Sequence, residues 1–254
     1  MIKSNNIPFD KELQDIVDLL LLHGTLVECP GLLHGKMGIA IFFFHYAHYT
    51  RNSLFIDYAW DLIEEIQKQI HANYRADYEK GIAGIGIGIG YLIKNNFLDV
   101  EDDIFYDFDE RMYRAVMYDP YTDFSLYEGL TGYGKYWIMR LCQDSFSKQA
   151  QDCLVKIIKQ IEIKLKSISF EEWNDVHAFL KDLQEISDLD VPSELLVQSL
   201  QKMQINSNID LNHKKSPNSM GLLYGYAGEG LKNLTVLRDT DSRWLRLLQS
   251  SFTL

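Results

Sequence analysis

The sequence predicts an all-α protein: an α/α barrel or toroid of about five helical hairpins, with Gly-x-x-Gly turns at one end. Three observations predict this class. A Gly-x-x-Gly motif recurs at intervals of about 48 residues, the length of one helical hairpin in a solenoid or toroid. Segments that are apolar all round alternate with amphipathic segments. The sequence lacks sustained alternation of polar and apolar residues between hairpin turns, which is the signal of a strand.

The glycine motif opens four repeats, which begin at Gly35, Gly81, Gly129 and Gly225. The last interval is about twice the others, so a fifth and degenerate repeat is expected with His177 at the lost glycine position. Residues 173–183 keep a helical spacing of apolar side chains there. Glycine at these turns is expected to permit positive φ and a close approach of helices.

Two kinds of helix are expected to alternate along the chain. Buried inner helices follow the glycine motifs because the sequence there is apolar on nearly every side. Outer helices with one wet face are expected where apolar residues form a single stripe, or where carboxylates gather at a first turn. In chain order the segments are 38–44 (inner), 59–70 (outer), 81–93 (inner), 101–110 (outer), 133–139 (inner), 154–168 (outer) and 173–183 (degenerate inner).

Composition limits the class of protein. The chain has 254 residues, of which 46% are hydrophobic, and the repeats continue throughout, so a single toroid domain spanning residues 1–254 is expected. The 36 acidic and 25 basic side chains give a net charge of −11. Such a charge repels phosphate backbones, which argues against a nucleic-acid partner.

The location of the protein is expected to be cytoplasmic. Residues 1–11 contain no apolar stretch long enough for a signal peptide. The longest uncharged apolar run, 81–93, is shorter than the roughly 20 residues of a membrane-spanning helix. Three cysteines at irregular spacing, Cys29, Cys142 and Cys153, are typical of reduced thiols rather than of a disulfide framework.

The turns are expected to form a ring, because each glycine motif occupies the same place in its repeat. One residue ahead of the first glycine stand His34, Lys80, Glu128, Val176 and Tyr224. Two residues ahead stand Leu33, Glu79, Tyr127, Asp175 and Leu223. This ring of side chains is the candidate functional site.

Two segments, 31–40 and 221–228, resemble the repeat motif of the lanthionine synthetase C-like (LanC-like) family, an α/α barrel. The resemblance extends over nearly the whole chain, although the chain is shorter than typical members. It implies a role in the maturation of ribosomally made, lanthipeptide-type peptides. Members of the family use zinc to activate a substrate cysteine thiolate for addition to a dehydrated residue.

The zinc ligands that the resemblance implies are missing from the sequence. The family's Trp-Cys-x-Gly and Cys-His-Gly turns do not occur, and Leu223-Tyr224 stands where the Cys-His pair is expected. Only Cys29 and His34 lie near the ring, and two ligands do not make a catalytic zinc site. No zinc or other cofactor is therefore expected. The favoured interpretation is a catalytically degenerate accessory protein that binds a precursor peptide or a partner modification enzyme.

Two alternatives stay open at this point: a peptide cyclase with an atypical site, and a glycan-processing α/α toroid enzyme whose carboxylates flank the scissile bond. The candidate catalytic residues are His34, Glu79 and Glu128, and in the glycan-processing alternative Asp175 is a further candidate acid or base. The candidate substrate-binding residues are Lys80, Tyr127, Trp173, Asp175 and Tyr224. The competing structural interpretation is that Glu128 and Asp175 cap helices or pair with nearby basic groups. An open ring of five hairpins would be closed by a second copy or a partner chain.

Overall fold

The computed structural model describes residues 10–99, 104–118, 123–186, 189, 191–204, 219–237 and 242–249. Every regular element in these ranges is a helix, which confirms the expected all-α class. The chain divides into two compact units. Unit 1 comprises Met1–Ile70 and Lys214–Ser242, and unit 2 comprises His71–His213 and Arg243–Leu254. A toroid of all the repeats in a single domain stays a prediction.

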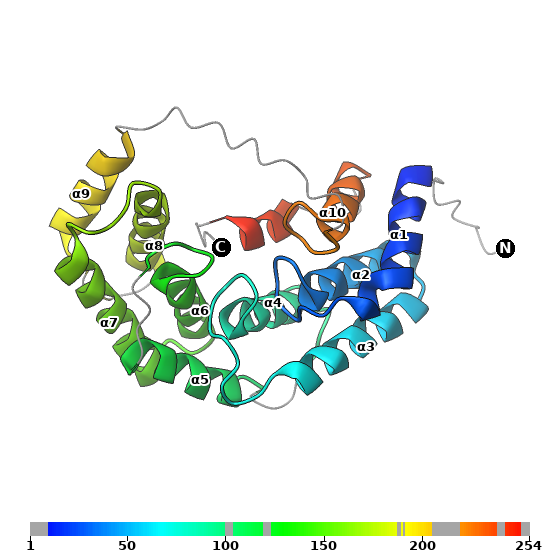
Figure 1. Ribbon diagram of the computed structural model, residues 1–254, viewed down its shortest axis with the longest axis horizontal. Coiled ribbons are helices and arrows are strands. Elements are labelled where there is room, and N and C mark those ends of the chain that lie inside the picture. The colour runs from blue at the N-terminus through cyan, green and yellow to red at the C-terminus, as the bar shows by residue number, and fades with distance from the viewer. Residues whose placement is uncertain are drawn as a thin grey trace. The chain divides into compact units, whose positions relative to one another are not determined.

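Unit 1 contains α1 (Lys11–His23), the 3₁₀ turn η1 (Gly24–Leu26), α2 (Lys36–Thr50), α3 (Leu54–Gln69) and α10 (Tyr226–Val236). In Figure 1 these helices are blue, cyan and orange. Helix α2 packs against both α3 and α10, and α1 packs against α10. Helix α2 is buried on nearly every side, whereas α1 and α3 each bury one stripe. The expected pairing of a buried helix with amphipathic ones is confirmed in this unit.

Unit 2 contains α4 (Ile82–Lys94), α5 (Tyr106–Met117), α6 (Leu130–Gln143), α7 (Lys148–Lys164), α8 (Glu172–Ile186), α9 (Ser193–Gln204) and most of the 3₁₀ helix η2 (Ser242–Leu248). Helices α4, α6 and α8 pack in a row (Figure 1). Helices α5, α7 and α9 lie against that row. Because α4 and α6 are buried nearly all round and α5 and α7 on one side, the predicted alternation is confirmed here too.

The glycine that precedes each repeat helix is extended rather than left-handed. Gly35, Gly81, Gly129 and Gly225 have φ of −125°, −104°, −98° and −113°, so the expectation of positive φ at these turns is wrong. Glycine is needed there for space. At each of the four positions an added Cβ would come within 3.0 Å of the carbonyl oxygen six residues earlier.

The same folded-back loops cap the helices. The first helical N–H donates to the carbonyl seven residues earlier, as from Lys36 to Cys29 at 2.9 Å and from Leu130 to Asp123 at 2.9 Å. None of the four glycine-led helices has a side-chain hydrogen bond at its cap. The loop backbone thus satisfies N–H groups that a helix start otherwise leaves without partners. The glycine motif therefore encodes a capping loop as well as a turn.

In three of the four glycine-led helices, a third glycine receives an aromatic ring from a neighbouring helix. An added Cβ would come within 3.0 Å of the Tyr136 ring at Gly86 and of the Phe42 ring at Gly230, and Phe179 would block it at Gly134. The glycine-rich helix α4 is therefore compensated by close packing, as its composition suggested.

The degenerate repeat begins earlier than the spacing predicted. Phe179 packs on Gly134 as Tyr136 packs on Gly86, and α8 begins at Glu172, so His177 lies inside the helix. The prediction that His177 occupies the lost glycine position is wrong. The helix start is shifted because this repeat lacks the folded-back glycine loop that fixes the start of the others.

Candidate functional site

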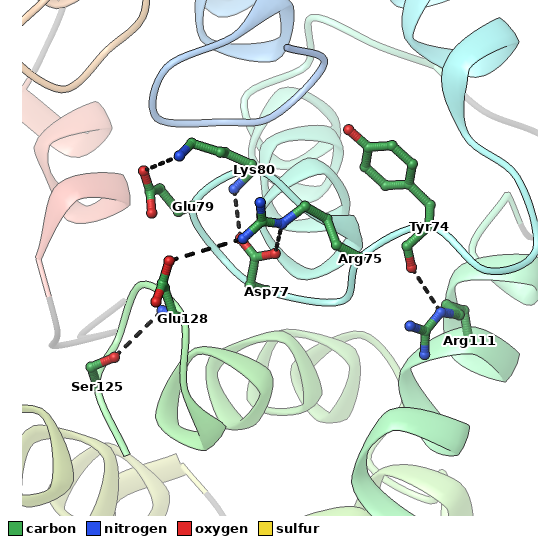
Figure 2. A network of polar contacts seen from close by, with 8 residues as sticks. All are labelled: Tyr74, Arg75, Asp77, Glu79, Lys80, Arg111, Ser125 and Glu128. Carbon is green, nitrogen blue, oxygen red and sulfur yellow. Dashed lines mark hydrogen bonds and ion pairs between the residues drawn. The ribbon is translucent and has the colours of Figure 1, made fainter. Parts of the chain in front are cut away.

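Two successive turn loops of unit 2, residues 75–80 and 123–128, are joined by hydrogen bonds. The backbone N–H groups of Tyr78 and Glu79 both donate to the carbonyl of Tyr127, at 3.0 and 2.9 Å. This pairing brings together four of the side chains that the sequence singled out: Glu79, Lys80, Tyr127 and Glu128. We call this group, with Arg75, the loop cluster; Figure 2 shows all of its members except Tyr127.

Each carboxylate of the loop cluster has a basic partner. Lys80 Nζ lies 3.1 Å from Glu79 Oε1. Arg75 Nη2 lies 4.0 Å from Glu128 Oε1, and Arg75 Nε donates to Asp77 (Figure 2). Glu79 is 15% exposed and Glu128 51%, so the pair that includes Glu128 is well hydrated. An exposed ion pair of this kind contributes about 0 to 1 kcal/mol to stability.

Asp77 and Ser125 fix the shape of the two loops from equivalent positions, four residues before the glycine. The N–H of Lys80 donates to Asp77 Oδ1 at 2.8 Å, and the N–H of Glu128 donates to Ser125 Oγ at 3.4 Å. The sequence analysis missed both residues. The signal was present, because Asp and Ser favour turns in which the side chain accepts a nearby backbone N–H.

Helix α5 anchors the segment that leads into the first loop. Arg111 Nε donates to the carbonyl of Tyr74 at 2.9 Å, and Arg114 Nη2 donates to the carbonyl of Ala72 at 3.3 Å. Tyr74 directly precedes Arg75, so the outer helix holds the loop cluster at its base (Figure 2).

Asp175 and Trp173 both lie in the first turn of α8, and both are engaged in contacts that hold the fold together. Asp175 Oδ2 accepts the N–H of Leu126 at 2.7 Å, and the neighbouring Glu172 Oε1 accepts the N–H of Phe124 at 2.6 Å. Trp173 is 4% exposed, so its ring offers little surface to a ligand. The alternative in which Asp175 caps a helix is close to what is observed. Asp175 does accept a backbone N–H, but that N–H belongs to the loop at 123–128 and not to a helix start.

Unit 1 brings the other two predicted site residues together. The N–H of Leu223 donates to the carbonyl of Leu33 at 2.9 Å, and Gly221 packs directly against the backbone of His34. Tyr224 is 42% exposed and has a φ of 56°, one of three described non-glycine residues with positive φ. His34 is half-buried. The predicted site residues are thus divided, with His34 and Tyr224 in unit 1 and the other six in unit 2.

Lys135 is a functional group that the sequence analysis did not consider. It lies on α6, is 3% exposed, and its Nζ donates to the carbonyls of Arg246 at 2.9 Å and of Gln249. The ring of Tyr78 lies 5.1 Å from Nζ. Burial lowers the pKa of Lys135 to about 7, although Asp182 and Asp175 partly oppose that shift. A lysine within an otherwise apolar helix segment was the signal that could have identified it.

One histidine and serine pair resembles a nucleophile with its base. His177 Nδ1 lies 2.9 Å from Ser199 Oγ, between α8 and α9. The Ser199 hydroxyl donates to the carbonyl of Leu196 at 2.8 Å, so in this contact it accepts a proton from His177. Ser199 is also fully buried. The pair therefore joins two helices and does not activate a nucleophile.

The family resemblance implies zinc chemistry, which needs several donor side chains at one place. Among the described residues, no three His, Cys, Asp or Glu side chains lie together as a metal ion requires. Cys29 is half-buried, Cys142 exposed and Cys153 buried, and burial raises the pKa of Cys153 well above its usual range. These residues do not fit a zinc ion.

Comparison with known proteins gives no family assignment. No family model matches the chain, and no curated protein matches it significantly. The resemblance to LanC-like proteins rests on the glycine repeats alone and stays a prediction. Within the described residues, no helix is both long and apolar enough to cross a membrane.

Proposed function

We propose that this protein binds a precursor peptide in the maturation of a ribosomally made peptide, as an accessory protein without zinc chemistry of its own. The loop cluster carries the proposal. It offers carboxylates, a guanidinium, an ammonium and the half-buried ring of Tyr127 on two joined loops, and this mixture suits a peptide better than a uniform anion. The LanC-like repeat motif supplies the biological setting.

The pairing of charges favours binding over proton transfer. Lys80 lies beside Glu79 and Arg75 beside Glu128, so each carboxylate already has a basic partner within the loop cluster. A catalytic carboxyl group must lie within hydrogen-bond reach of the proton that it transfers, and a basic partner competes for that position. The atypical cyclase and the glycan-processing enzyme are therefore less favoured than the accessory protein. A partner modification enzyme, or a second copy closing the ring, stays a prediction.

A second observation supports peptide binding. Lys135 and Tyr78 hold the protein's own segment 246–249 through three backbone carbonyls, with Tyr78 Oη donating to Leu247 at 2.8 Å. These contacts use no side chain of the bound segment. Unit 2 thus already recognises main chain in a manner that depends little on sequence.

The test is fluorescence anisotropy with a labelled synthetic peptide of net positive charge that contains Ser, Thr and Cys. The Glu79→Gln, Glu128→Gln double variant is expected to bind about 5-fold to 30-fold more weakly, because each charge contributes about 0.5 to 1 kcal/mol at such a surface. The control variant, Glu162→Gln with Glu171→Gln, removes two exposed carboxylates elsewhere in unit 2. Equal affinity in both double variants would exclude the loop cluster as the peptide-binding site.

A separate assay distinguishes the alternatives. The protein is incubated with a dehydrated, cysteine-containing peptide, and free thiols are counted by alkylation and mass spectrometry. We expect every thiol to stay free. Cyclisation by the protein alone would overturn the accessory role, and release of reducing sugar from a glycan panel would favour the glycan-processing alternative.

A further inference from the structure

We propose that unit 2 contains a second binding site, a pocket for a small amphipathic carboxylate. The pocket lies between α4, α6 and η2, has a cavity volume of about 80 Å³ and opens to solvent. None of its lining residues belongs to the loop cluster. The lining residues are Ile87, Gly90, Tyr91, Lys94, Asn95, Lys135, Met139, Arg243, Arg246 and Leu247.

The charge of the pocket is opposite to that of the protein. Its lining has four basic side chains, Lys94, Lys135, Arg243 and Arg246, and no carboxylate. The whole chain has a net charge of −11, with 36 acidic and 25 basic residues. A local group of this sign on an acidic protein concentrates anions at the pocket.

Charge and apolar surface are separated by depth. Ile87, Met139 and Leu247 are buried, with exposures of 3%, 6% and 4%. Lys94 and Arg246 are exposed, as is Arg243, so their charges lie at the mouth. The fourth basic group, Lys135, is buried and donates to the carbonyls of η2. An occupant with an apolar body and an anionic head matches this gradient.

A single carboxylate fits the site better than a phosphate group. The walls are mainly apolar, and a doubly charged, strongly hydrated head would lose more hydration on entry. The planar guanidinium of arginine pairs with a carboxylate through two parallel hydrogen bonds. Met139 packs on Gly90, and its unbranched side chain can adapt to the shape of an apolar body. Two kinds of molecule combine an apolar body with a single carboxylate: a free fatty carboxylate, and a peptide that ends in an apolar residue.

The test is isothermal titration calorimetry of the full chain with decanoate, compared with decanol and decyl phosphate. Decanoate is expected to bind, and decanol at least tenfold more weakly because it lacks the charge. Binding of decanol as tight as that of decanoate would overturn the proposal, as would tenfold tighter binding of decyl phosphate. A hexapeptide ending in leucine, with its carboxylate free or amidated, identifies the source. Preference for the free peptide over decanoate indicates a peptide terminus, and the reverse indicates a fatty carboxylate.

Two variants locate the binding. Lys94→Gln with Arg246→Gln removes mouth charges but keeps the Arg246 carbonyl that Lys135 contacts, and should weaken decanoate about tenfold or more. Lys159→Gln with Lys181→Gln removes two exposed lysines elsewhere in unit 2 and should leave it unchanged. Gly90→Leu, checked for helix content by circular dichroism, should block the pocket. Full decanoate affinity in both the mouth variant and a folded Gly90→Leu variant would overturn the proposal.

Discussion

Asp77 and Ser125 show how a single side chain can set a loop. Each accepts the N–H three residues later, from equivalent positions in successive repeats, whereas Gly31 and Gly221 stand at this position in unit 1. Asp77 also binds Arg75 and is 6% exposed, so its charge is desolvated but paired. Ser125 makes a longer, neutral bond. Asp77 is therefore expected to contribute more to stability than Ser125.

Asp77→Ala should lower the free energy of unfolding by about 1.5 to 3 kcal/mol, because it removes charge-assisted hydrogen bonds from a buried position. Ser125→Ala should cost about 0.5 to 1 kcal/mol. Urea denaturation followed by circular dichroism measures both. Asp77→Asn keeps an acceptor for the Lys80 N–H, so its cost in unfolding free energy should lie between those of Ser125→Ala and Asp77→Ala. A cost for Asp77→Ala no larger than that for Ser125→Ala would contradict the assignment.

Substitution by alanine should change stability very differently at two glycines of unit 2, Gly132 and Gly90. A Cβ at Gly132 would meet the Leu126 backbone carbonyl, which cannot move without the loop, so Gly132→Ala should destabilise by about 1 to 3 kcal/mol or more. At Gly90 the nearest atom is Met139 Sδ at 2.9 Å, the far part of a flexible side chain. Gly90→Ala should be within about 1 kcal/mol of the parent, because alanine favours the helix. Thermal unfolding of the two variants side by side tests this contrast, and equal melting temperatures would refute it.

Helix α8 replaces a loop that its repeat has lost. In the preceding pair of repeats, the backbone carbonyl of Tyr127 accepts the N–H of Tyr78. For the loop at 123–128 the corresponding N–H, that of Leu126, is accepted by the Asp175 carboxylate instead. Phe179 still packs on Gly134. The degenerate repeat thus keeps its packing and supplies from side chains the acceptors that a glycine loop would supply from backbone.

Asp175→Ala should lower the free energy of unfolding by about 1 to 3 kcal/mol, since it leaves the Leu126 N–H without its carboxylate acceptor. Asp175→Asn retains an acceptor oxygen and should recover part of the loss. Hydrogen exchange provides a local measurement, because the Leu126 amide should exchange faster in Asp175→Ala. Unchanged exchange at Leu126 would show that the carboxylate does not hold this loop. Glu171→Ala, at an exposed neighbouring position, is the control.

At the scale of the molecule, the C-terminal part of the described chain is tied to helices formed by much earlier residues. Lys135 binds carbonyls 111 and 114 positions away, and Tyr78 binds one 169 positions away. The last carbonyls of a helix have no partners within it. Lys135 supplies partners for η2, and its burial shifts the pKa of the amine from the ordinary 10.5 to about 7. Folding is therefore coupled to the release of a proton.

Stability should rise with pH between about 7 and 8.5. The folded pKa of Lys135 lies below the unfolded one, so in this range the unfolded state binds more protons and deprotonation favours folding. Above about pH 8.5 the trend should weaken, because burial raises the pKa of Cys153 and the unfolded thiol ionises first. Above about pH 10 it should end, because burial also raises the pKa of Tyr78. The expected gain is about 2 kcal/mol.

The measurement is urea unfolding at several pH values for the parent and Lys135→Met. The variant loses the contacts to Arg246 and Gln249 and should be less stable at high pH, but the informative quantity is the slope of unfolding free energy against pH. That slope should nearly vanish in Lys135→Met. An equal slope in both proteins would show that another group is responsible. Lys181→Met, an exposed lysine of α8, should keep the parent slope.

Local sequence patterns predicted the helical class, the places of four repeat helices and the nearly complete burial of three of them, α2, α4 and α6. These features are local: a helical stripe repeats every few residues, and a glycine loop closes within seven. Tertiary structure decided where the degenerate repeat begins, which bases accompany Glu79 and Glu128, and what Asp175 and Lys135 contact. Several of these contacts join residues 49 to 114 positions apart, such as Leu126 with Asp175 and Lys135 with Gln249. One-dimensional periodicity carries no information about such pairs, because they form only when the helices pack.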